Sequence, residues 1–179
     1  MKLDKNFKEI LSSQAISIIG GLVAGTFLAV RINELILIPG LLIILPGFLE
    51  MRGNISGTLS ARISSGLFLG VIKPRHIKTR VVKGNLIASF FLAIFVSLVL
   101  GILAFAFNYF FLETVTLKII LLPVIAGALA NLIEVPLALM FTFILFRRGH
   151  DPNNIIGPVL TSSGDIISIV SLLVTLVIL

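Results

Sequence analysis

Four apolar segments, each long enough to cross a membrane, constrain this sequence more than any other feature. They cover residues 10–31, 85–112, 118–146 and 155–179. A helix needs about 20 apolar residues to cross the hydrocarbon core of a bilayer. Only 12% of the residues are charged and 58% are hydrophobic, whereas a soluble domain carries about 25% charged residues. The sequence therefore predicts an all-α integral membrane protein.

A fifth apolar segment, residues 35–72, is interrupted by prolines, glycines and charged side chains. A helix of this length would measure about 57 Å, too long for one simple span and too short for two spans with a turn. Pro46 removes a backbone donor, and Gly53, Asn54 and Gly57 loosen the following turns. Such backbone is tolerated at membrane depth only where protein or a wet cavity covers it. We therefore predict one long, broken second helix in the centre of the protein.

The basic residues predict the orientation. Most of them cluster in three places: Lys2, Lys5 and Lys8, the loop 73–83, and residues 147–148. If residues 35–72 cross once, these clusters share one side of the membrane, and only Arg31 and Lys118 fall on the other. The positive-inside rule then gives five spans, with the N-terminus cytoplasmic and the C-terminus outside. The net charge of +6 is therefore assigned to the membrane surface and its anionic lipid rather than to nucleic acid.

The sequence offers little support for an enzyme. Cysteine is absent, which excludes disulfides and thiolate metal sites, and both histidines lie in polar segments beside basic residues. Neither of the glycine-rich nucleotide-binding motifs occurs. We therefore expect no catalysis and no ATP-driven transport by this chain alone, and an intramembrane hydrolase is a distant alternative.

The ionisable residues within the predicted spans are the candidate functional groups, because such residues are costly in a membrane. They are Glu50, Arg52, Arg62, Glu134 and Asp165. On a helix, Thr161 and Ser168 share the face of Asp165. A carboxylate among hydroxyl, amide and carbonyl oxygens suits a hard cation such as magnesium or calcium, and suits copper or zinc poorly.

Alternatives stay open at each of these positions. Asp165 is either a cation ligand or half of a buried ion pair with Arg52 or Arg62, and Arg62 alternatively reaches the cytoplasmic interface. Glu134 is either a second carboxylate of an ion pathway or a protonated structural group. Asn54 is either an amide ligand at a helix break or a helix cap.

Two motifs carry a family resemblance. The first is PGFLEMRGNISGTLSARISSGLFLG, residues 46–70, with a Pro…Gly-Asn signature followed by Leu-x-x-Arg-x-Ser. The second is HDPNNIIGPVLTSSGDIIS, residues 150–168, with an Asp-Pro…Pro…Thr…Asp pattern at the start of the last predicted span. Both resemble the MgtE-type magnesium transporters and the related animal solute carriers of family forty-one.

The resemblance implies a single cation-conducting membrane domain, residues 1–179, with a pathway at the interface of a homodimer. Asp165 would be the central metal ligand, with Asn54 and Thr161 near it, and we add Glu134 and Glu50 as further metal candidates. Bacterial MgtE carries a large cytoplasmic region before its spans, and we expect no such regulatory domain in this chain.

The predicted function is divalent cation transport across the cytoplasmic membrane, by a channel or a sodium-coupled exchanger. Magnesium is the first candidate for the transported ion, and manganese, cobalt and calcium are alternatives. Hard oxygen ligands serve all of these ions, so the ligand types alone do not separate them. The alternative function is a non-transporting membrane scaffold or metal-sensing subunit.

Overall fold

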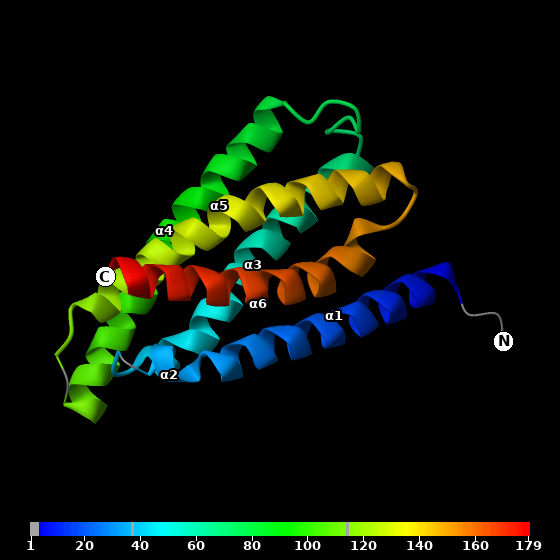
Figure 1. Cartoon of the computed structure of the whole chain (residues 1–179). Helices are drawn as coiled ribbons and strands as arrows, with labels where there is room; N and C mark the ends of the chain where they lie inside the picture. The colour runs from blue at the N-terminus through cyan, green and yellow to red at the C-terminus, as the bar shows by residue number, and fades with distance from the viewer. Residues whose placement is uncertain (1–3, 37, 114) are drawn as a thin grey trace.

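The computed structural model describes residues 4–36, 38–113 and 115–179, and every regular element in those ranges is helical. The elements are α1 (Lys5–Val30), α2 (Ile32–Leu35), α3 (Leu41–Phe68), α4 (Arg80–Phe107), the π-helical turn η1 (Asn108–Leu112), α5 (Lys118–Arg147) and α6 (Pro152–Ile178). Helix α3 packs against α4, α5 and α6, whereas α1 lies along α6 (Figure 1). The prediction of an all-α protein is confirmed.

Within the described residues, four helices are long and apolar enough to cross a membrane: α1, α4 continued by η1, α5 and α6. They correspond to the four uninterrupted segments of the sequence, and large apolar side chains cover much of their outer surface. The chain is therefore a multi-pass membrane protein. Helix α3 has 28 residues, similar to the others, but its three charged residues, Glu50, Arg52 and Arg62, lie well inside the helix, whereas the three of α1 lie near its start.

The central helix differs from the broken helix predicted over residues 35–72. The interruption falls before α3, after α2 ends at Leu35, and α3 then runs continuously from Leu41 to Phe68 through Pro46. A proline inside a helix removes a single backbone donor. Packing against three neighbouring helices holds the remaining turns together, so the loss of that donor does not end the helix.

The turn before α3 is fixed by a glycine and an asparagine. Gly40 has a φ of +78°, a left-handed conformation that glycine adopts without the steric penalty of a Cβ atom. A Cβ atom at Gly40 would also overlap the side chain of Asn108 in η1. The buried Asn108 donates from Nδ2 to the carbonyl oxygen of Pro39 at 2.7 Å. This bond ties the start of α3 to the far end of α4.

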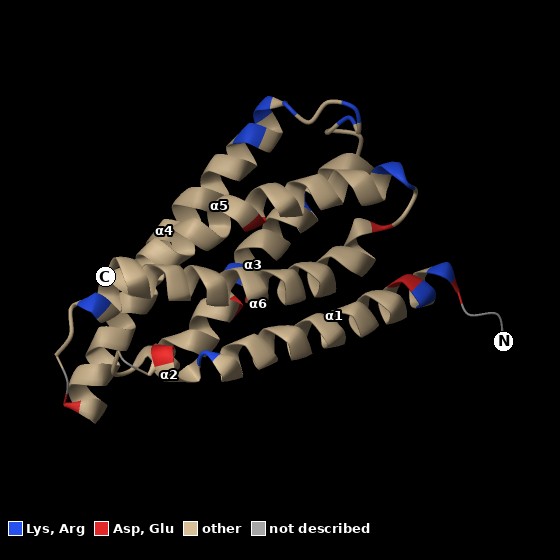
Figure 2. Cartoon of the chain, viewed as in Figure 1, with Lys and Arg blue, Asp and Glu red and all other residues tan. Residues whose placement is uncertain are grey.

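Lysine and arginine residues gather at one end of the molecule, at the start of α1, in the α3–α4 loop and at the end of α5 (Figure 2). Hydrogen bonds connect these segments. Among them, Arg147 Nε donates to the Pro74 carbonyl oxygen, and Lys5 Nζ donates to the Gly149 carbonyl oxygen, both at 2.7 Å. Lys2 lies outside the described residues. The described basic clusters thus share one end, the arrangement that the predicted orientation requires.

Candidate functional site

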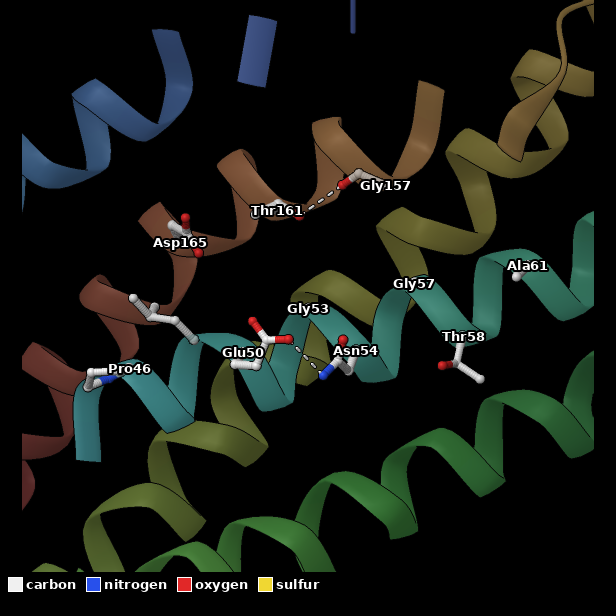
Figure 3. Close-up of a pocket in the computed structure, with 11 residues that line it drawn as sticks. Pro46, Glu50, Gly53, Asn54, Gly57, Thr58, Ala61, Gly157, Thr161 and Asp165 are labelled. Carbon is white, nitrogen blue, oxygen red and sulfur yellow. Dashed lines mark hydrogen bonds between the residues drawn. The ribbon is translucent and has the colours of Figure 1, made fainter. Parts of the chain in front are cut away.

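A pocket with polar side chains lies between α3 and α6 and opens on the surface of the helix assembly. It has a volume of about 590 Å³. Figure 3 shows Glu50 and Asn54 on α3 facing Thr161 and Asp165 on α6. The structure therefore brings four of the five predicted metal-site residues to one pocket.

The α6 side of the pocket follows from the motif in residues 150–168. Asp151 caps the helix, because its Oδ1 accepts a hydrogen bond from the Asn153 backbone N–H at 2.9 Å, and Pro152 occupies the first helical position. Gly157, Thr161 and Asp165 then follow at intervals of four and line the pocket together. Ser168, expected on this face, is buried and lies outside the pocket lining.

The α3 side of the pocket carries an amide and a carboxylate one turn apart. Asn54 Nδ2 donates to Glu50 Oε1 at 3.1 Å, and both residues are exposed on this face. Asn54 lies in the middle of continuous α3, so it is neither at a helix break nor a helix cap. The amide nitrogen of Asn54 donates to Glu50, and the amide oxygen of Asn54 is an acceptor.

Arg52 links the two carboxylates that α5 and α6 contribute. Its Nη2 donates to Asp165 Oδ1 at 3.0 Å, and its Nη1 pairs with Glu134 Oε1. Ser56 Oγ also donates to Glu134 Oε1, at 3.0 Å. The side chains of Arg52 and Glu134 are fully buried, whereas that of Asp165 is 22% exposed. The ion pair left open for Asp165 is thus present, and Arg52 is shared with Glu134.

The position of Arg52 depends on a glycine in the facing helix. A Cβ atom at Gly164 would overlap the Arg52 guanidinium and would lie 2.5 Å from Glu134 Oε1. Only glycine therefore leaves room on α6 for the guanidinium to reach both carboxylates. The sequence contained the three charged residues and this glycine, but nothing in it indicated that one arginine would serve two helices.

The two other ionisable candidates lie away from the pocket centre. Glu134 is fully buried and does not line the pocket. Arg62 is exposed on α3. Among the described residues, no three His, Cys, Asp or Glu side chains converge as a metal cluster.

Asp165 is thus an ionisable residue of a multi-pass helical protein and is partly exposed to a pocket between two helices. Ionisable residues within membrane helices are candidates for ion pathways. The sequence model of the MgtE family, described as divalent cation transporters, matches residues 45–175. The chain therefore belongs to the MgtE family, as its two motifs predicted. The matched region includes most of α3 and all of α4 and α5, together with α6 to Thr175, and α1 precedes it. A comparison with curated proteins gave no match.

Proposed function

We propose that this chain moves a divalent cation, with magnesium as the first candidate, across the cytoplasmic membrane. The observation that supports this most directly is the partial exposure of Asp165 to the pocket between α3 and α6. A carboxylate at membrane depth is costly unless it is paired or serves an ion pathway. Asp165 Oδ1 is engaged by Arg52, which leaves Oδ2 available to a cation in the pocket.

In this proposal Asp165 is the principal ligand, and the other polar residues of the pocket act on the water around the ion. Thr161 and Asn54 offer oxygens to coordinated water molecules, and Glu50 adds negative charge on the opposite wall. A magnesium ion keeps most of its water and requires only one or two carboxylates. The pocket volume of about 590 Å³ accommodates such a hydrated ion.

We propose five spans, with α3 as the second. Its 28 residues correspond to a length of about 42 Å, which exceeds the roughly 30 Å of the hydrocarbon core. If α3 is the second of five spans, the start of α1 and the α3–α4 loop lie on the same side of the membrane. Both belong to the basic end of the molecule in Figure 2. The positive-inside rule places that end in the cytoplasm.

We also propose that two parallel copies enclose the pathway. Glu50, Asn54, Thr58 and Arg62 are exposed on α3 at intervals of four, and form one polar stripe along the central helix. Lipid chains cannot solvate such a stripe at membrane depth. A second copy facing the stripe would cover it and would convert the open pocket into a lined pathway.

The proposed function is tested by ion flux into liposomes that contain only this protein. Uptake of magnesium, manganese, cobalt and calcium is measured separately, with and without a sodium gradient. We expect magnesium flux, and its dependence on sodium distinguishes an exchanger from a channel. Absence of flux for all four ions under every gradient would refute transport by this chain and favour a scaffold or sensing role.

A further inference from the structure

We infer that Arg52 is a resident counter-cation of the ion site, which lowers the negative charge seen by a transported ion and positions Asp165. The inference rests on the proposed function of the pocket between α3 and α6. It assigns to Arg52 and Glu134 roles that differ from ion coordination. Glu134 anchors the guanidinium, and Asp165 alone of the two carboxylates faces the ion.

The geometry fixes Arg52 beside the pocket rather than in it. Its side chain has no exposed surface, although its chain neighbours Gly53 and Asn54 line the pocket. The absence of a side chain at Gly164 provides the space that the guanidinium occupies. A buried arginine without carboxylate partners would be strongly unfavourable, and here each of two carboxylates accepts from a different guanidinium nitrogen.

Glu134 keeps Arg52 in place when an ion arrives. Glu134 is fully buried, receives a second hydrogen bond from Ser56, and lies outside the pocket lining. A cation that binds Asp165 therefore meets a guanidinium that is already held by another carboxylate. Since Arg52 occupies Oδ1 of Asp165, the rotation of that carboxylate is restricted, and the remaining oxygen is presented to the pocket.

The charge balance of the three groups explains why a resident cation is useful. Two carboxylates and one guanidinium carry a formal charge of −1, whereas the two carboxylates alone would carry −2. Conduction requires a site that attracts the ion but binds it weakly enough to release it. A divalent ion beside a charge of −2 in a poorly solvated interior would be held much more tightly. Arg52 thus favours turnover over retention.

Four variants of the full chain separate this electrostatic role from a purely structural one. Arg52→Gln gives the three positions a formal charge of −2, Glu134→Gln gives 0, and the double variant Arg52→Gln/Glu134→Gln restores −1. Arg52→Lys keeps the charge and changes the shape. The affinity for magnesium is measured from the dependence of Tm on MgCl2 concentration in nanodiscs, beside magnesium flux in liposomes.

We expect Arg52→Gln to bind magnesium at least about tenfold more tightly than the wild type and to transport it more slowly. Glu134→Gln should bind at least about tenfold more weakly. The double variant and Arg52→Lys should return to within a few-fold of the wild-type affinity. If Arg52→Gln does not fold, the ordering of the other three variants against the wild type still decides the question.

The inference is overturned if folded Glu134→Gln, or folded Arg52→Gln, has the wild-type affinity. It is also overturned if the double variant binds no better than Glu134→Gln. A structural role predicts changes in Tm without this charge-dependent ordering of affinities. The wild-type flux measurement tests the proposed function separately, because absence of flux in the wild type refutes that function. Normal wild-type flux together with unchanged magnesium affinity in the variants refutes only the role of Arg52.

Discussion

Replacement of Asp165 by asparagine separates the two roles that the structure allows for this residue. In the wild type, Arg52 is shared between Glu134 and Asp165. Asp165→Asn removes one negative charge and leaves Arg52 paired with Glu134. The penalty of about 3–5 kcal/mol for stranding one member of a buried ion pair therefore does not apply.

The expected loss of stability is correspondingly small. The variant weakens the bond between Arg52 Nη2 and the residue at position 165, which is 3.0 Å long in the wild type. A hydrogen bond to a charged group contributes about 1.5–3 kcal/mol. The asparagine carbonyl oxygen still accepts from Arg52, so we expect a destabilisation of about 1–2 kcal/mol. Transport, in contrast, should be lost or sharply reduced, because the pocket loses its principal ligand.

The assay combines magnesium flux in liposomes with thermal unfolding at increasing MgCl2 concentration. A ligand at 100 times its Kd stabilises the folded protein by about 2.7 kcal/mol, so the wild type should melt later in magnesium and Asp165→Asn should not. Asp151→Asn is the matched control: it makes the same change on α6 at the helix cap, where asparagine is equally favourable. We expect wild-type stability, protection and flux from Asp151→Asn.

Two results would contradict this reasoning. If Asp165→Asn is folded, transports at the wild-type rate and is still protected by magnesium, Asp165 is not the principal ligand, and Glu50 is the next carboxylate to test. If Asp165→Asn fails to assemble while Asp151→Asn is normal, the pairing of Asp165 with Arg52 is primarily structural. Loss of flux with retained stability agrees with the proposal.

Three further predictions concern stability, orientation and assembly. Gly101→Ala should destabilise the protein by about 1–3 kcal/mol, because the new Cβ atom would lie 2.5 Å from the Ile120 carbonyl oxygen on α5. Gly84→Ala on the same helix is the control: its Cβ atom meets nothing within 4 Å, so this variant should be neutral or stabilising in thermal unfolding. A cysteine introduced at Thr79 should react with an impermeant thiol reagent only from the cytoplasmic side, and reaction from outside would reverse the proposed orientation. Native mass measurement in nanodiscs should give a dimer, and a monomer that still transports would refute the shared pathway.

The apolar segments of the sequence predicted the outer helices well because span length follows directly from bilayer thickness. The four uninterrupted segments match α1, α4 with η1, α5 and α6 to within a few residues. The continuity of α3 was not predictable in the same way. Whether Pro46 ends a helix depends on the packing around it, and that packing comes from helices distant in the sequence.

The pocket was predictable in part for a related reason. Helical periodicity correctly placed Thr161 with Asp165, and the two motifs identified the segments that meet across the pocket. The sharing of Arg52 between Glu134 and Asp165 depends instead on the relative register of three helices. No spacing within one helix encodes that register. The absence of a side chain at Gly164 is what allows that register to bring Arg52 to both carboxylates.

The polar character of α3, which made its span hard to recognise, follows from its position in the molecule. Glu50 faces the pocket, Arg52 faces the carboxylates of α5 and α6, and Arg62 continues the exposed stripe. A helix at the lipid boundary would not tolerate three such charges. A helix enclosed by α4, α5, α6 and the proposed second copy does tolerate them, because each charge meets protein or water. The least apolar of the long helices is thus the one on which we propose the ion site.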